Sequence, residues 1–201
     1  GDGQPWNPYA TIQHGIDMGS DGDSIMVLAG TYYENINYYS KKLSLIGEDR
    51  ETTIIDGGQN GSVVTFSGEE DSTTVLQGFT IQNGYATCGG GIYYEYWANG
   101  DGCCLAEGNP YVMDVKIINN FAGYRGGGIC SRGPTDINLM NAIISNNTII
   151  TEGFGAGIYN YQGDMHLTNV IISDNGFTSE SNTYGGEISC KADSDGSEYG
   201  L

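Results

Sequence analysis

The sequence predicts an all-β solenoid, a right-handed parallel β-helix with a short N-terminal cap helix. Three observations support this prediction: a motif that recurs at a common period, a glycine-rich motif that alternates with it, and apolar runs of only two or three residues. Such self-similarity indicates stacked units, and the 33 glycines together with the short runs exclude helical repeats. We therefore expect each unit to be one coil of short strands, with equivalent strands paired in parallel about 4.8 Å apart.

Residues 1–22 predict a cap for one end of the solenoid. Asn7 followed by Pro8 has the form of a helix N-cap with proline at the first helical position. Gly19 can end such a helix. Three apolar residues would share its buried face: Tyr9, Ile12 and Ile16.

Residues 23–201 predict the turns of the solenoid. In the first half, short runs rich in β-branched residues are each bounded by Gly, Asp or Asn, which is typical of strands. These runs are residues 23–32, 43–47, 53–57, 62–66 and 74–78. The chain opens with Gly-Asp-Gly and has no signal peptide, so we interpret it as a single β-helix domain excised from a longer polypeptide.

The second half contains the two alternating motifs. The first motif aligns without gaps at residues 78–84, 114–120, 141–147 and 169–175. The later two of its intervals are nearly equal, and the first is longer. The glycine-rich motif falls at residues 89–92, 126–129, 155–158 and 185–188.

Alignment of the motifs predicts which residues stack. We expect two interior columns of isoleucine: Ile81, Ile117, Ile144 and Ile172 in one, and Ile92, Ile129, Ile158 and Ile188 in the other. We also expect an asparagine column at one corner, in which the residues adopt the left-handed conformation and bond to one another along the axis: Asn120, Asn147 and Asn175.

The longer interval predicts a loop insertion at about residues 94–109. Insertions in repeat proteins lie on the surface and often carry function. Five aromatic residues in or near it could stack on sugar rings: Tyr93, Tyr94, Tyr96, Trp97 and Tyr111. The alternative is that these rings pack on the flank of the solenoid.

The chain is strongly acidic, with 7 Lys and Arg against 25 Asp and Glu, a net charge of −18 and a pI of about 4.1. A field of this sign repels nucleic acid and anionic lipid, so no nucleic-acid partner is expected. No apolar run approaches the roughly 20 residues of a membrane helix, so no membrane insertion is expected. A polyanionic sugar would be repelled as well, unless a cation bridged it to the protein.

Carboxylates at alternate positions predict Ca²⁺ as the one cofactor, because Ca²⁺ prefers oxygen ligands. The two candidate loops carry Asp21 with Asp23, and Asp193 with Asp195. Plain turns are the alternative, since neither loop continues with the glutamate of an EF-hand. Residues 69–71, Glu-Glu-Asp, predict a solvated turn.

The chain has five cysteines and no Cys-x-x-Cys pair, so a zinc site is not expected. Two of them lie in the insertion, Cys103 and Cys104, and two flank it, Cys88 and Cys130. We expect Cys88 or Cys130 to form a disulfide with Cys103 or Cys104, which would pin the loop. Disulfides are compatible with export to an oxidising space.

Residues 10–13, 22–25, 29–36 and 43–47 together resemble the start of the pectin-lyase-like right-handed β-helix superfamily, which includes pectinesterase-like, NosD-like and alginate-epimerase-like domains. The later Gly-Gly-Gly-Ile and Ile-Ser-Asn-Asn units resemble the repeats of bacterial surface and secreted β-helix proteins. The resemblance covers nearly the whole chain and implies an extracellular or cell-surface location. It implies a fold more than a function, because the superfamily holds lyases, hydrolases, epimerases, adhesins and passive stalks.

The resemblance also suggests where catalytic residues would lie. Family lyases use an Arg or Lys base beside an acidic Ca²⁺ site, and the candidates for this base are Lys116, Arg125 and Arg132. Asp164 and His166 resemble the Asp and His of the epimerase-like branch, although the surrounding epimerase motif is absent. No second cation falls in the column of Lys116 or Arg125 in the next repeats, so solvated surface charges are the alternative.

These observations favour an exported module for surface attachment, a structural role or carbohydrate contact, with a polysaccharide or cell-surface glycan as partner. A polysaccharide lyase or related carbohydrate-active enzyme is the alternative. A second alternative is a subunit that stacks head to tail into an extracellular filament, because no cap is apparent after Ile188 and bare strand edges template pairing.

Overall fold

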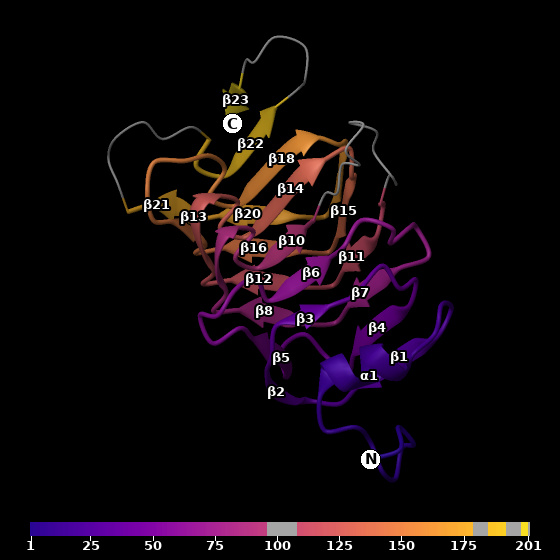
Figure 1. Cartoon of the computed structure of the whole chain (residues 1–201). Coiled ribbons are helices and arrows are strands. Elements are labelled where there is room, and N and C mark those ends of the chain that lie inside the picture. The colour runs from indigo at the N-terminus through magenta and orange to yellow at the C-terminus, as the bar shows by residue number, and fades with distance from the viewer. Residues whose placement is uncertain (96–107, 179–184, 192–197, 201) are drawn as a thin grey trace.

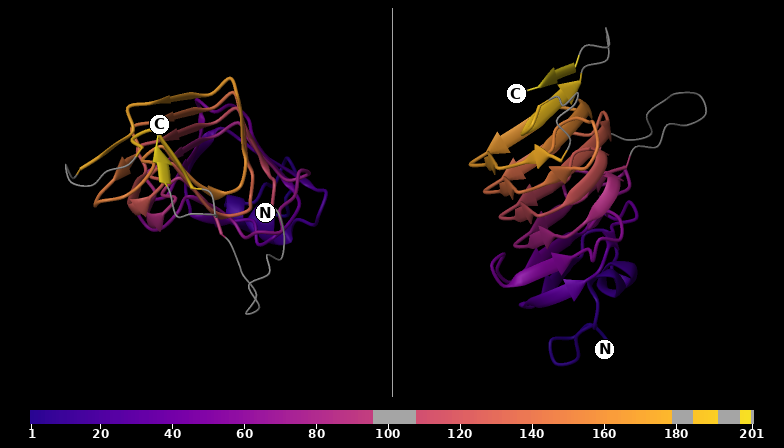
Figure 2. Two further views of the ribbon diagram at one scale, coloured as in Figure 1. Left: turned by 90° about the horizontal axis from the view of Figure 1, so that it is seen from above. Right: turned by 90° about the vertical axis from the view of Figure 1, so that its left-hand side faces the viewer.

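The structure, a computed structural model, describes residues 1–95, 108–178, 185–191 and 198–200. It is a right-handed parallel β-helix, as the sequence predicts, whose coils rise in order from the N-terminal to the C-terminal end (Figure 1). Seen along the axis, successive coils nearly superimpose around a common interior (Figure 2). The chain visits the sheets in the same order in each coil, although one of the four sheets begins only at the third coil, and we name each sheet by its first strand.

Two of the sheets have six strands each, all paired in parallel. The β1 sheet contains β1 (Ser24–Val27), β4 (Ser44–Gly47), β7 (Val75–Gln77), β11 (Tyr111–Met113), β15 (Ile137–Met140) and β19 (Met165–Thr168). The β2 sheet contains β2 (Gly30–Tyr33), β5 (Thr53–Asp56), β8 (Thr80–Gln82), β12 (Lys116–Ile118), β16 (Ile143–Ser145) and β20 (Ile171–Ser173).

The other two sheets meet at one side of the solenoid. The β3 sheet contains β3 (Ile36–Asn37), β6 (Val64–Phe66), β10 (Ile92–Tyr94), β14 (Ile129–Gly133), β18 (Ile158–Gln162), β22 (Ile188–Lys191) and β23 (Glu198–Gly200). The four-stranded β9 sheet contains β9 (Tyr85–Cys88), β13 (Phe121–Arg125), β17 (Thr148–Ile149) and β21 (Gly176–Phe177).

Columns of apolar side chains fill the interior, because alternate residues of each strand point inward. Both predicted isoleucine columns are confirmed by the strand register, in the β2 and β3 sheets: Ile81, Ile117, Ile144 and Ile172, and Ile92, Ile129, Ile158 and Ile188. The β1 sheet supplies a third column, Leu45, Leu76, Val112, Leu139 and Leu167.

An asparagine ladder runs along one interior corner, as predicted. The Asn147 carboxamide oxygen accepts bonds from both the backbone and the side-chain N–H of Asn120, each at 3.0 Å. Asn175 accepts the equivalent pair from Asn147, at 3.0 and 2.9 Å. The predicted left-handed conformation is wrong for these residues, because the corner is turned one position earlier, at positive φ: Asn119 (55°), Asn146 (56°) and Asp174 (59°). The residue at that position bends the chain, so the ladder asparagine that follows it faces the interior.

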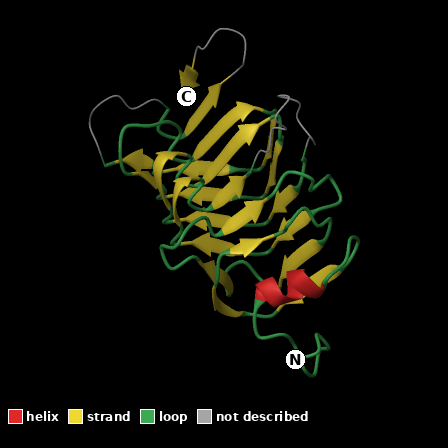
Figure 3. Ribbon diagram, in the orientation of Figure 1, coloured by secondary structure: helices red, strands yellow, loops and turns green. Residues whose placement is uncertain are grey.

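The helix α1 (Ile12–Met18) lies at the N-terminal end of the solenoid (Figure 3). It begins at Thr11, whose hydroxyl accepts the N–H of His14 at 3.3 Å, so the predicted start at Asn7 and Pro8 is wrong. The backbone N–H of Asn7 instead closes a short turn. In the described part of the chain, no helix has the length and apolarity needed to cross a bilayer.

Contacts from later in the chain explain where α1 begins and ends. The Glu34 carboxylate accepts the N–H groups of Ile12 and Gln13, both at 2.9 Å, which satisfies the first unpaired donors of the helix. Ile12 and Ile16 are buried, as a cap requires. At the other end the Lys41 ammonium donates to three carbonyl oxygens: those of Ile16, Asp17 and Gly19.

Glu70 is fully buried, so the predicted solvated turn at residues 69–71 is wrong at its middle residue. Its carboxylate accepts three backbone N–H groups, from Ser40 at 3.0 Å, Ser67 at 2.8 Å and Gly68 at 2.7 Å. These bonds compensate the loss of water around the charge and tie two coils together.

The two ends of the solenoid present different edges. At the C-terminal end β23 runs antiparallel to β22 and pairs its backbone groups, so the expected lack of a cap after Ile188 is wrong for the β3 sheet. At the N-terminal end β1 and β2 are the outermost strands of their sheets, and Met26 and Leu28 are exposed there. Head-to-tail association through these edges stays a prediction.

Candidate functional site

A groove with a volume of about 460 Å³ lies on the outer face of the β1 sheet. The register places Tyr111, Asn138 and His166 in one outward-facing row on three consecutive coils. Tyr111 is 38 % exposed, so part of this residue is accessible to a ligand. The groove is lined by Ser72, Asn109, Tyr111, Asp136, Asn138, Leu139, Met140, His166 and Thr168.

Hydrogen bonds fix the polar part of this groove. The Asn138 side chain donates to the carbonyl of Asn109 at 3.4 Å, and the Asp136 backbone N–H donates to the Asn109 side-chain oxygen at 3.3 Å. The Asp136 carboxylate accepts the N–H of Asp164 at 2.9 Å and lies 4.0 Å from the His166 imidazole. The groove thus offers an aromatic face beside oriented amide and carboxylate groups, the arrangement that suits a neutral hydroxylated ligand.

The structure brings some of the residues predicted from sequence together at the groove, and it adds others that were not predicted. Tyr111 and His166 line the groove, and Asp164 supports it through Asp136. Asn109, Asp136 and Asn138 were not predicted. The signal for Asn138 was its place one repeat after Tyr111 and one repeat before His166 in the sequence.

None of the Lys or Arg candidates lines this groove in the described part of the chain. Lys116 lies on the β2 sheet, where its ammonium pairs with the carboxylate of Glu51. Among the described residues that line the groove, His166 is therefore the basic side chain, and neither an Arg nor a Lys is present.

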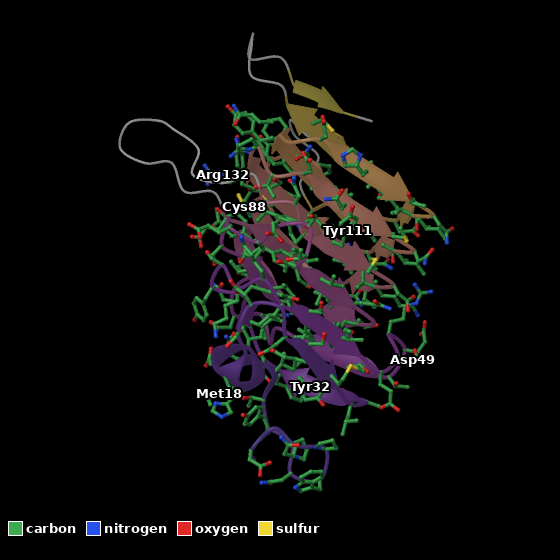
Figure 4. All side chains as sticks on the ribbon, turned by 90° about the vertical axis from the view of Figure 1, so that its right-hand side faces the viewer. Met18, Tyr32, Asp49, Cys88, Tyr111 and Arg132 are labelled. Atoms are coloured by element: carbon green, nitrogen blue, oxygen red, sulfur yellow. The ribbon has the colours of Figure 1, made fainter. Side chains whose placement is uncertain are left out.

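A second cluster lies in the angle between the β3 and β9 sheets. It contains Cys88, Cys130, Tyr159, Tyr93, Phe154 and Tyr161. Two catalytic candidates border it, Arg125 and Arg132, and Figure 4 shows Arg132 close to Cys88, with Tyr111 on a separate part of the flank. This cluster brings residues from three coils into one partly buried site.

The charges in this cluster act on its thiols. A hydrogen bond from the Cys130 thiol, together with the nearby guanidinium groups of Arg132 and Arg125, lowers the pKa of Cys88 to about 7 against the opposing effect of burial. Burial and the same hydrogen bond raise the pKa of Cys130 well above its ordinary value. Cys88 is therefore the thiol that ionises first, and the thiolate is the reactive form.

The predicted aromatic site is only partly supported by where the side chains lie. Tyr94 is 2 % exposed and stacks on Phe66 at 5.1 Å between ring centroids, so its predicted role in sugar contact is wrong. Successive side chains of a strand point to opposite faces of the sheet. Tyr94, the last residue of β10, therefore points inward and its neighbour Tyr93 points outward. Tyr93 is half-buried against the thiol cluster. Tyr96 and Trp97 lie outside the described residues.

The predicted disulfide also falls partly outside the described residues, because these do not include Cys103 and Cys104. In the structure Cys88 and Cys130 are free thiols, as is Cys190. The predicted loop insertion at residues 94–109 overlaps the same stretch: Tyr94 belongs to β10, and residues 96–107 are not described.

Of the predicted Ca²⁺ residues, Asp21 and Asp23 bind backbone N–H groups. Asp21 accepts the N–H of Lys42 at 2.9 Å, and Asp23 accepts the N–H of Ser20 at 2.8 Å. Asp193 and Asp195 lie outside the described residues. Where the structure is described, no three His, Cys, Asp or Glu side chains gather as a metal site.

Calcium binding stays a prediction with a direct test. If Ca²⁺ binds the folded state, millimolar Ca²⁺ raises the melting temperature above that in chelator. Differential scanning calorimetry of the full chain measures the shift, and Mg²⁺ at the same concentration controls for ionic strength. Identical melting curves in Ca²⁺ and in chelator would contradict the prediction.

The strand order defines the class of this chain: it is a right-handed parallel β-helix protein. No protein-family model matches the sequence. A probable autotransporter, YfaL of Escherichia coli (strain K12), is 32 % identical over 83 residues, which cover 38 % of this chain and 7 % of that protein. This chain therefore corresponds to a small part of that relative's length.

Two solved structures with similar folds are pectin methylesterases. A mutant in complex with a hexasaccharide is 14 % identical with a TM-score of 0.42, over 89 % of this chain and 66 % of the other. The enzyme from Aspergillus niger, in deglycosylated form, is 16 % identical with a TM-score of 0.37, over 96 % and 80 %.

Proposed function

We propose that this chain is an exported β-helix module that holds a neutral polysaccharide against the groove of the β1 sheet and does not cleave it. The observation that carries the proposal is the row of Tyr111, Asn138 and His166, which places an aromatic face and two polar groups on three consecutive coils. A ligand lying along the solenoid axis would meet the exposed Tyr111 and His166 side chains, with Asn138, which is 8 % exposed, between them in the groove.

Charge favours a neutral over an acidic sugar. The net charge of −18 repels polyuronates, and the groove itself carries the Asp136 carboxylate. Apolar stacking on Tyr111 and hydrogen bonds to the amides do not depend on ligand charge. The absence of Lys and Arg among the described residues that line the groove supports binding over the alternative, a polysaccharide lyase. Similarity of 83 residues to a probable autotransporter supports an exported protein.

A glycan array with a Tyr111→Ala variant tests the proposal. We expect this variant to bind the recognised neutral glycan about tenfold more weakly, which corresponds to a loss of about 1.4 kcal/mol. The matched control is Tyr85→Ala, which removes a ring 47 % exposed on the β9 sheet and should leave affinity unchanged. Equal loss in both variants, or no glycan bound by the parent, would refute the site. An assay for unsaturated products on uronate polymers separates binding from lyase activity.

A further inference from the structure

The angle between the β3 and β9 sheets holds two thiols from consecutive coils. Cys88 ends β9 and lies opposite Arg125 in the strand register, whereas Cys130 lies in β14 opposite Tyr93. Both side chains are buried, Cys88 at 9 % exposed and Cys130 at 0 %. The two side chains pack in one buried cluster with Tyr159, which places their thiols close together.

Fixed positive charge surrounds this thiol pair. The Arg125 guanidinium sits over three aromatic rings, at 4.5 Å from the Tyr124 centroid, 5.0 Å from Tyr159 and 5.8 Å from Phe154. Its Nε is buried with no hydrogen-bond partner among the described residues, and the side chain bonds to Cys88. Because these rings hold the guanidinium in place, its charge stays beside the sulfur. Arg132 adds a second positive charge and is bonded to Tyr93.

We propose that Cys88 and Cys130 form a redox-active pair that closes to an inter-coil disulfide by exchange with a small-molecule or protein disulfide. The Cys88 thiolate attacks one sulfur of the oxidant, forms a mixed disulfide and releases one thiolate. Cys130 then loses its proton to that thiolate and attacks the Cys88 sulfur, releasing the second thiolate, which takes up the proton lost by Cys88. Two protein thiols are oxidised, and one disulfide is reduced to two thiols.

The geometry assigns the order of the two steps. Cys88 retains some solvent exposure and lies near the guanidinium groups of Arg125 and Arg132, so it makes the first attack. Cys130 is fully buried in the same cluster as Cys88, which makes it the resolving thiol. The pairing differs from the sequence-based expectation, in which either thiol bonds to Cys103 or Cys104.

Mass mapping of a non-reduced digest tests the pairing. The full chain is reduced, equilibrated with oxidised glutathione and digested after alkylation of free thiols. We expect a peptide pair joined through Cys88 and Cys130. A bond from either residue to Cys103 or Cys104, or both thiols alkylated after oxidation, would overturn the proposal. A Cys103→Ser/Cys104→Ser variant should form the same bond as the parent.

Two further measurements separate a redox-active pair from a buried structural pair. In the Cys103→Ser/Cys104→Ser background, the rate of Cys88 modification by iodoacetamide should rise through an inflection near pH 7, as thiolate forms. Oxidation should raise the melting temperature by about 5–10 °C, because the bond closes a long loop. Cys130→Ser should abolish this rise, whereas Cys190→Ser should retain it. An inflection near pH 9, or no rise on oxidation, would count against the pair.

Discussion

Replacing Ile144 with Asp is expected to unfold the solenoid in solution. Ile144 is fully buried in the middle of a column, between Ile117 and Ile172 on the neighbouring coils. A carboxylate there meets apolar side chains above and below and has no cation to pair with in that column. The cost of burying it, more than about 4 kcal/mol, takes up most of the roughly 5–15 kcal/mol that stabilises a typical domain.

Circular dichroism and urea denaturation measure this effect against a matched control. Ile171→Asp introduces the same charge one residue before the column, at a side chain that is 58 % exposed, and should keep the spectrum and the unfolding midpoint close to those of the parent. If Ile144→Asp unfolds at the same urea concentration as Ile171→Asp, the interior assignment of this column is wrong.

Replacing Asn147 with Ala is expected to lower the free energy of unfolding by about 3 kcal/mol or more, because each buried polar group left without a partner costs about 1–3 kcal/mol. The Asn147 side chain donates to the Ile117 carbonyl at 2.9 Å and to Asn175, and it accepts two bonds from Asn120. Its removal therefore leaves several buried polar groups unpaired at once. The ladder also connects three coils, so the loss is not confined to one.

The neighbouring residue provides the control for the ladder. Asn146 turns the corner at φ 56°, and its side chain donates to the Ser145 hydroxyl at 3.3 Å. Asn146→Gly keeps a conformation that glycine adopts without strain and should change stability by less than about 1 kcal/mol. Chemical denaturation followed by tryptophan or tyrosine fluorescence compares the two variants. Equal loss in both would show that the corner, and not the amide ladder, carries the stability.

Much of the fold could be predicted because its determinants are local and repeat. The isoleucine columns and the asparagine ladder follow from aligning motifs that recur at a nearly constant period, and the register pairs the predicted residues. The start of α1 could not be predicted, because the carboxylate that caps it comes from Glu34, well beyond the end of the helix in sequence. Burial of Glu70 was missed for a similar reason, since its partner Ser40 lies on the preceding coil.

The candidate sites were harder to predict, because coil stacking decides which residues meet. The sequence places Cys88 and Cys130 around an insertion and so points to Cys103 and Cys104 as their partners. Stacking instead sets these two thiols beside each other and adds Arg125 from β13, which pairs with the strand of Cys88. Asp136 and Asn109 come together in the same way, from adjacent coils on the other flank.

The spacing of the asparagine ladder has a consequence for what this molecule can physically reach. One step of the ladder, from Asn147 to Asn175, takes 28 residues and advances the structure by about 4.8 Å. The same residues in a single extended strand would span about 90 Å. Most residues of a coil therefore run around the solenoid axis, and each coil adds little length along it. Each added coil contributes a new strip of outer surface and lengthens the solenoid only slightly. This geometry suits a molecule that binds ligands along its outer surface better than one that spans the space between two partners.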